Sequence, residues 1–206
     1  MIPAESFIPF ITASVLLTIS PGPDIIYVLV QSVANGTRAG VITTLGLVSG
    51  IIIHTALVAF GVSALIQQSE NTFYIIKILG AAYLFFLAFK VWKSKEGVPI
   101  TNSTISFSNK MQLFKTGFLM NVLNPKVTIF FLAFFPGFLW DPTGNTIAQF
   151  LILGILFMLQ AFVIFGIVAL MAGKISIFLN RSTGTQLVFK WVQIIVFLGI
   201  GIFILI

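Results

Sequence analysis

Long apolar runs separated by short polar segments dominate the pattern along the chain. A helix that crosses the hydrocarbon core of a bilayer needs about 20 mostly apolar residues. The runs reach this length, unlike the roughly 10-residue alternating segments of an outer-membrane barrel, and so they predict helices. We expect six membrane spans, at about residues 3–34, 39–66, 72–92, 111–139, 146–172 and 187–206.

The only long polar stretch, at residues 93–110, divides these spans into two sets of three. It has no hydrophobic face and is predicted to be a cytoplasmic linker. The flanking units are residues 1–92 and 111–206. Because three is an odd number, the second unit enters the membrane in the opposite sense to the first, as in the inverted repeats of many transporters. The predicted fold class is an all-α integral membrane protein of two inverted three-helix repeats.

The first and fourth spans are each broken by proline, in SPGPD at 20–24 and NPK at 124–126. Proline ends a helix because it lacks an N–H group, but it is favoured at the first position of a new helix. We expect one half-helix to be capped by Asn124 and the other to restart from Ser20 or Gly22. The matching positions of the two breaks favour a repeat over two ordinary proline kinks.

Composition supports the membrane assignment. Of the 206 residues, 58% are hydrophobic and only 8% are charged, whereas a soluble domain carries about 25% charged residues. The surface must therefore face lipid. Cysteine is absent, which excludes disulfides and cysteine-bound metals. No Walker A or dinucleotide motif is present, and the chain lacks the paired groups of known intramembrane proteases. We expect no cofactor and no enzymatic activity.

The net charge of +6 reflects membrane topology, and no nucleic-acid partner is expected. Lysine and arginine gather in the odd-numbered loops, while the second and fourth loops hold only Glu70 and Asp141. By the positive-inside rule, the odd loops are cytoplasmic and both termini are non-cytoplasmic. The basic residues in or beside the odd loops are Arg38, Lys90, Lys93, Lys95, Lys110, Lys174, Arg181 and Lys190.

Asp24 and Lys126 are ionisable residues deep within apolar spans. A charge at such a depth costs about 3 kcal/mol on insertion scales and is a functional candidate by default. One interpretation is a structural salt bridge that joins the two broken helices. The other is that Asp24 carries a proton or receives a substrate ammonium while Lys126 receives a carboxylate.

Other candidates accompany these two charges. The broken backbone leaves N–H and C=O groups unpaired near the midplane, which is tolerated only beside protein or a water-filled cavity. His54 and Gln160 are weaker candidates, since each is more typical of packing or of hydrogen bonds between helices. The expected substrate and proton pathway comprises Ser20, Pro21, Gly22, Pro23, Asp24, Asn121, Asn124, Pro125 and Lys126.

Several stretches closely resemble the LysE/RhtB family of lysine and homoserine–threonine exporters. They include SPGPDIIYVLVQSVANGTRAG, IKILGAAYLFFLAFKVWK and GFLMNVLNPKVTIFFLAFFPGF, and the resemblance covers almost the whole chain. It implies export of amino acids or their derivatives across the bacterial inner membrane, driven by the proton motive force. It also marks positions 21–24 and 124–126, although many relatives have Asn in place of Asp24.

The chain is therefore expected to be a multi-pass secondary transporter of the inner membrane. Its few deep acids favour a neutral amino acid over a dibasic one. We expect proton antiport with alternating access around Asp24 and Lys126, and the glycine-rich helix faces allow a homodimer. A passive channel for small solutes and a non-transporting membrane scaffold are the alternatives.

Overall fold

A computed structural model of the chain describes residues 2–64, 70–94, 109–141, 143–180 and 183–205. Within these ranges every regular element is helical. Most of the predicted linker, together with Lys95 and Arg181, lies outside the described residues. The elements in chain order are α1 (Ala4–Ile19), α2 (Pro23–Asn35), α3 (Thr37–Ala56), η1 (Leu57–Val62), α5 (Glu70–Lys93), α6 (Lys110–Val122), α7 (Pro125–Ile129), η2 (Phe130–Phe134), η3 (Phe135–Phe138), α8 (Thr146–Asn180) and α9 (Thr183–Leu205).

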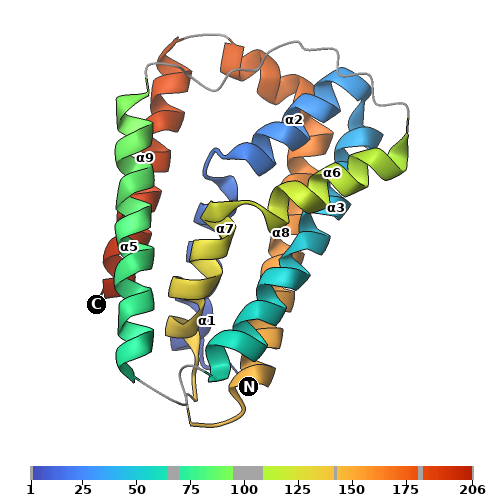
Figure 1. Cartoon of the computed structure of the whole chain (residues 1–206). Coiled ribbons are helices and arrows are strands. Elements are labelled where there is room, and N and C mark those ends of the chain that lie inside the picture. The colour runs from blue at the N-terminus through green and yellow to red at the C-terminus, as the bar shows by residue number, and fades with distance from the viewer. Residues whose placement is uncertain (1, 65–69, 95–108, 142, 181–182, 206) are drawn as a thin grey trace.

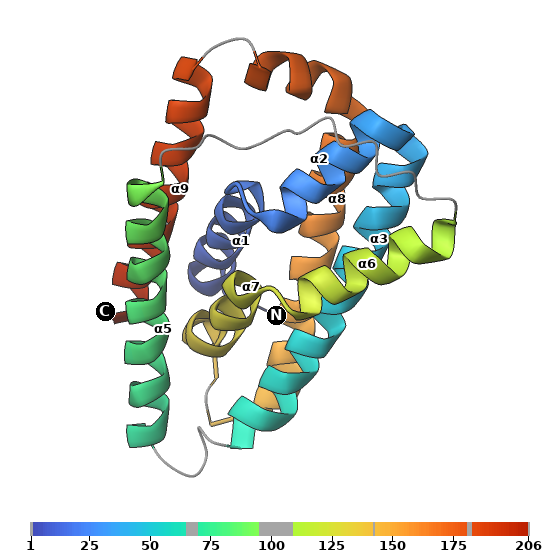
Figure 2. The same ribbon diagram turned by 45° about the horizontal axis from the view of Figure 1, so that its top comes forward.

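The helices form two outer groups with a broken pair between them. Helices α5 and α9 pack together on one side, and α3, α6 and α8 gather on the other (Figure 1). Helices α1 and α7 lie between these groups in both views (Figure 2). The two breaks therefore occupy the interior of the protein.

The helix lengths agree with most of the predicted spans. Four helical stretches of the described chain are long and apolar enough to cross a membrane, and the number rises to six if each bent helix pair counts as one span. Helix α8 continues to Asn180, beyond the predicted end of the fifth span at 172. A lysine at position 174 does not end this helix because a long side chain can reach the interface from within a span.

Both proline motifs break a helix at the predicted place. Helices α1 and α2 meet at an angle of 54°, and α6 meets the α7–η3 segment at 46°. Helix α2 restarts with Gly22 as its N-cap and Pro23 in its first turn. Helix α7 has Asn124 as its N-cap and Pro125 in its first turn. The N-cap of α7 is thus the expected residue, and the N-cap of α2 is Gly22, the second of the two expected residues, while Ser20 ends α1.

Glycine brings the second and fourth predicted spans into close contact. A Cβ atom at Gly50 of α3 would lie 2.8 Å from Asn121 Oδ1 and 3.0 Å from the carbonyl oxygen of Phe118 on α6. A Cβ atom at Gly117 of α6 would lie 2.5 Å from the carbonyl oxygen of Thr43 on α3. Small residues at this crossing let the two backbones touch, and the contact carries Asn121 into the interior.

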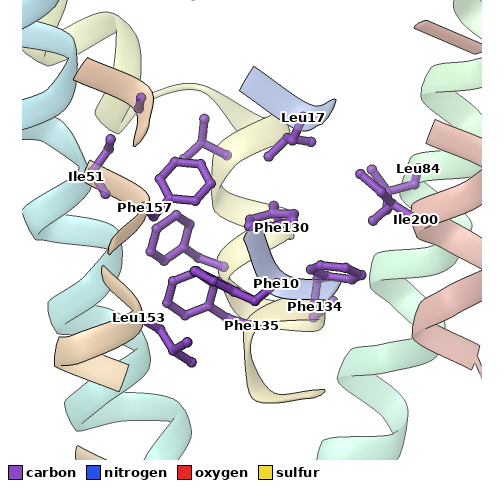
Figure 3. Close-up of a cluster of buried hydrophobic side chains, with 14 of the residues drawn as sticks. Phe10, Leu17, Ile51, Leu84, Phe130, Phe134, Phe135, Leu153, Phe157 and Ile200 are labelled. Carbon is purple, nitrogen blue, oxygen red and sulfur yellow. The ribbon is translucent and has the colours of Figure 1, made fainter. Parts of the chain in front are cut away.

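A cluster of aromatic rings fills the interior on one side of the breaks (Figure 3). Rings from α1, from the α7–η3 segment and from α8 pack edge-to-face or stacked. Helices α1 and α7 run from the breaks toward the end of the protein that holds the N-terminus (Figure 1), so the cluster lies on that side. We call it the phenylalanine cluster; its members are Phe10, Phe130, Phe131, Phe134, Phe135, Phe138, Phe150 and Phe157.

Candidate functional site

The two helix breaks enclose a small cavity. Its polar side is formed by both proline motifs and by the end of α6, and its apolar side by α1, α3, α7 and α8. Its volume is about 20 Å³, which suffices for one water molecule by the usual requirement of roughly 10–15 Å³. The lining residues are Leu17, Thr18, Ser20, Gly22, Asp24, Ile25, Ile51, Asn121, Asn124, Lys126, Val127, Phe157, Ala161 and Phe165.

Asp24 brings a carboxylate to this cavity from the first turn of α2. The side chain is 7% exposed, and its Oδ2 accepts a hydrogen bond of 3.2 Å from Asn121 Nδ2. The first turn of a helix favours a negative charge because its N–H groups and dipole point toward that end. The start of α2 therefore favours a negative charge at Asp24.

Lys126 brings an ammonium group from α7, and its side chain is 8% exposed. Its Nζ donates a hydrogen bond of 2.8 Å to the carbonyl oxygen of Ser20, the residue at the C-terminal end of α1. The same ammonium lies 5.8 Å from the ring centre of Phe197 on α9. In this conformation Lys126 thus connects the second break to the backbone carbonyl of the first. Asp24 and Lys126, which are both described residues, form no salt bridge with each other.

Three oxygen atoms of the lining residues lack a hydrogen-bond partner among the described residues. They are Ser20 Oγ, Asp24 Oδ1 and Asn121 Oδ1. Buried polar groups normally have a hydrogen-bond partner, and a buried group left without one lowers stability by about 1–3 kcal/mol. All three belong to residues around one cavity. Unpaired acceptors gathered in this way can receive a ligand that donates several hydrogen bonds.

The two weaker candidates, His54 and Gln160, form hydrogen bonds with residues that line the cavity. His54 is buried on α3, and its Nε2 lies 3.0 Å from the carbonyl oxygen of Asn121. Gln160 on α8 donates a hydrogen bond of 2.9 Å to Thr18 Oγ1. Neither His54 nor Gln160 lines the cavity, whereas Thr18 does.

The apolar wall of the cavity was not predicted from the sequence. Phe157, Ala161 and Phe165 follow one another at every fourth position of α8 and so share one helix face. Ile51 on α3 completes the wall. The spacing of four was the available signal, but α8 is apolar on every side and the stripe does not stand out in its sequence.

A second and larger cavity of about 310 Å³ lies on the other side of Lys126. We call it the vestibule. Lys126, Gly22 and Asn124 line both the vestibule and the inner cavity. The remaining lining residues of the vestibule are Pro23, Leu87, Lys90, Val91, Ser94, Pro125, Gln193 and Phe197.

Most of the predicted pathway residues are therefore brought together at these two cavities. Pro23 and Pro125 line the vestibule only. Pro21 differs, since it lines an apolar groove with Ile19, Ile26 and residues of α8.

The family described as LysE type translocator matches residues 15–206. The chain belongs to the LysE family. No solved structure matches this LysE-family chain.

The relatives of this LysE-family chain include named efflux proteins. A homoserine/homoserine lactone efflux protein of Salmonella typhimurium is 34% identical over 73% of the chain and 72% of its own length. A leucine efflux protein of Salmonella choleraesuis is 29% identical over 70% of the chain and 68% of its own length. An uncharacterized membrane protein of Vibrio cholerae is 34% identical over 81% of the chain and 80% of its own length.

Proposed function

We propose that this LysE-family chain exports small neutral amino acids or their derivatives across the bacterial inner membrane by proton antiport. The observation that carries the proposal is the cavity between the breaks, which is lined by the carboxylate of Asp24, the ammonium of Lys126 and two further unpaired oxygen atoms, Ser20 Oγ and Asn121 Oδ1. A zwitterionic amino acid has the complementary groups. Its ammonium offers three N–H donors and its carboxylate several acceptors.

The substrate orientation follows from the partners. The ammonium pairs with Asp24 and the unpaired oxygens of Ser20 and Asn121. The carboxylate pairs with the ammonium of Lys126, because a hydrogen bond between two charged partners is a strong one. The side chain then faces the apolar wall on α8. With one acid in the cavity lining, the site fits a neutral substrate better than a dibasic one, and the names of the homoserine and leucine efflux relatives support this class.

Transport requires the inner cavity to open. A space for one water molecule cannot hold an amino acid, whereas ligand pockets usually measure about 300–1,000 Å³. The vestibule reaches that size on one side of Lys126, and the phenylalanine cluster closes the other side. We infer alternating access, in which this conformation is closed at the phenylalanine cluster and approached from the vestibule.

The packing supports an inverted repeat as the basis of that movement. Helix α3 packs against α6, and α8 packs against α1 and α2. Helix α5 packs against α9, and α3 packs against α8. Suppose that α1–α2, α3 and α5 correspond to α6–α7, α8 and α9. The contact of α3 with α6 then corresponds to the contact of α8 with α1 and α2, and the α5–α9 and α3–α8 contacts each correspond to themselves. Such repeats exchange equivalent conformations around a fixed midplane site.

The orientation follows from the basic residues. The linker end of α5 carries Lys90 and Lys93, and Lys190 of α9 donates a hydrogen bond of 2.6 Å to the carbonyl oxygen of Ser94 at that end. We infer that this end, which includes the vestibule, is cytoplasmic, because positive residues remain on that side. An exporter needs its substrate to arrive from the cytoplasm.

Flux measurements in inside-out membrane vesicles test the proposal. An exporter should take up leucine or homoserine into such vesicles with saturable kinetics, and an imposed pH gradient, acid inside, should increase the rate. A membrane potential of 100 mV also contributes about 2.3 kcal/mol to the driving force for each elementary charge that crosses the membrane. Uptake that is linear in substrate and indifferent to the gradient would indicate a channel, and no uptake of any amino acid would indicate a scaffold.

A further inference from the structure

The vestibule combines a substantial volume with a positive charge. Lys90 of α5 and Lys126 of α7 both line it, and among the lining residues that the structure describes there is no aspartate or glutamate. Lys190 adds a third ammonium beside it, through the hydrogen bond to the carbonyl oxygen of Ser94. A concave surface with one sign of charge concentrates ligands of the opposite sign.

The vestibule also contains donors that can orient an anion. Gln193 on α9 carries a half-buried amide at its wall. The apolar residues Leu87, Val91 and Phe197 form the rest of the wall on α5 and α9. A pocket of this kind offers N–H donors to a carboxylate and apolar surface to a short side chain.

Lys126 stands between the vestibule and the inner cavity. Its ammonium is occupied by the carbonyl oxygen of Ser20 at 2.8 Å, and a Cβ atom at Gly22 would lie 3.3 Å from that ammonium. The contact with Ser20 is a hydrogen bond from a cation to a neutral carbonyl. A hydrogen bond between two charged partners is stronger, so a carboxylate competes effectively for the same ammonium.

We propose that the vestibule is a first binding site for the carboxylate of the exported amino acid, separate from the midplane site. The proposal rests on the proposed function. Lys90 attracts the carboxylate and Gln193 donates a hydrogen bond to it. The carboxylate then replaces Ser20 as the partner of Lys126, which frees the first break from the second and admits the substrate to the inner cavity.

The chemistry recognised here is an anionic oxygen group, which a lipid phosphate also provides. The substrate carboxylate is favoured because the vestibule leads directly to the residues of both breaks. The test must therefore separate a free amino acid from a lipid headgroup.

The central experiment compares Lys90→Glu with Lys93→Glu. Both lysines lie in the last turn of α5, but only Lys90 lines the vestibule. In inside-out vesicles we expect Lys90→Glu to raise the KM for leucine by up to about fivefold with kcat nearly unchanged, since one exposed charge contact accounts for at most about that factor. The effect should shrink at high salt, because the charges are screened. Lys93→Glu should retain the wild-type KM.

Two further arms identify the ligand. Leucinamide lacks the carboxylate, so its inhibition constant against leucine uptake should be the same in wild type and Lys90→Glu. The KM difference should persist in reconstituted vesicles of phosphatidylcholine alone. A difference that appears only when phosphatidylglycerol is present would assign the vestibule to an anionic lipid headgroup and overturn the proposal.

The outcomes separate this inference from the proposed function. If wild-type protein transports no amino acid, the proposed function fails. If wild-type transport is intact and Lys90→Glu has the same KM as Lys93→Glu, the vestibule inference fails while the proposed function stands.

Discussion

The two helix breaks share one plan but differ in how they are held. Each places a proline in the first turn of a new helix and an ionisable residue directly after it. The second break is capped from within, because Asn124 Oδ1 accepts a hydrogen bond of 3.0 Å from the backbone N–H of Lys126. The first break has Gly22 at the same position, and no side chain caps it.

This difference makes the first break dependent on the second. The carbonyl oxygen of Ser20 lies at the end of α1, and it accepts a hydrogen bond from the side chain of Lys126 in the other half of the chain. Asp24 likewise takes its hydrogen bond from Asn121, one turn before the second break. We infer that the second break is the fixed element and that the first responds to whatever binds Lys126. Substitutions at the two breaks can test this division.

The largest effect is expected from Asp24→Asn in the first break. The amide keeps an oxygen for Asn121 Nδ2 but cannot ionise or exchange a proton. We expect the acceleration of uptake by a pH gradient to disappear, while the thermal unfolding temperature stays at or above the wild-type value because a buried charge has been removed. The readout is uptake in inside-out vesicles with and without the gradient. Asp141→Asn, at an exposed site outside the spans, is the matched control, and a wild-type gradient response in Asp24→Asn would exclude this residue as the proton carrier.

Lys126→Met should have the next largest effect, since it removes the connection between the breaks. The carbonyl oxygen of Ser20 loses its partner, and an unpaired buried acceptor lowers the free energy of unfolding by about 1–3 kcal/mol. Lys115→Met, on an exposed position of α6, should change it little. Chemical denaturation in detergent gives both values.

A double substitution shows whether the charge of Asp24 contributes to the loss of unfolding free energy in Lys126→Met. Residues of one network show interaction energies of about 0.5–3 kcal/mol. Lys126→Met combined with Asp24→Asn should therefore be less destabilised than the sum of the single variants. Strict additivity would mean that the two breaks are energetically independent, against the division drawn above.

Asn124→Ala tests the internal cap of the second break. Loss of a helix N-cap costs about 1 kcal/mol. Asn109 caps α6 in the same way, with its side chain accepting a hydrogen bond of 3.0 Å from the backbone N–H of Met111, but it is exposed. Asn124→Ala and Asn109→Ala should therefore lose similar stability in thermal unfolding. Only Asn124→Ala should also slow uptake, because Asn124 lines both cavities; equal slowing in both variants would reduce the second break to a purely structural element.

The sequence predicted the breaks better than their partners. Proline chemistry placed one cap at Asn124 and the other at Ser20 or Gly22, because local rules decide where a helix starts. It did not predict the partner of Lys126, since a backbone carbonyl from a residue 106 positions away leaves no trace in the residue pattern. Lys90 was assigned to topology alone, because a lysine at the end of a span fits the positive-inside rule whether or not it lines a cavity.

The apolar half of the site was hidden for another reason. Hydrophobic periodicity locates the buried face of a helix only when the opposite face is polar. In α8 the face around Phe157 and Ala161 lines the cavity, while Ile155 and Leu159 are exposed on the outer surface. Lipid and protein interior select the same residue types, so the sequence of this helix does not distinguish its two faces.

The smallest effect is expected from Gly22→Ala. Gly22 is the N-cap residue of α2, and it has no side chain that could cap the helix. The added Cβ would lie 3.3 Å from Lys126 Nζ and 3.6 Å from its Cδ, and the end of a flexible side chain can move by the few tenths of an ångström required. Alanine is also a poorer N-cap than glycine, so we expect a loss of less than about 1 kcal/mol in thermal unfolding. Gly166→Ala in α8 has no neighbour within 4 Å of the added Cβ and should gain about 0.5–1 kcal/mol from reduced backbone freedom. Opposite signs would show that the cost is specific to Gly22, where the N-cap preference and the contact with Lys126 act together; a gain at both positions would mean that neither constrains the first break.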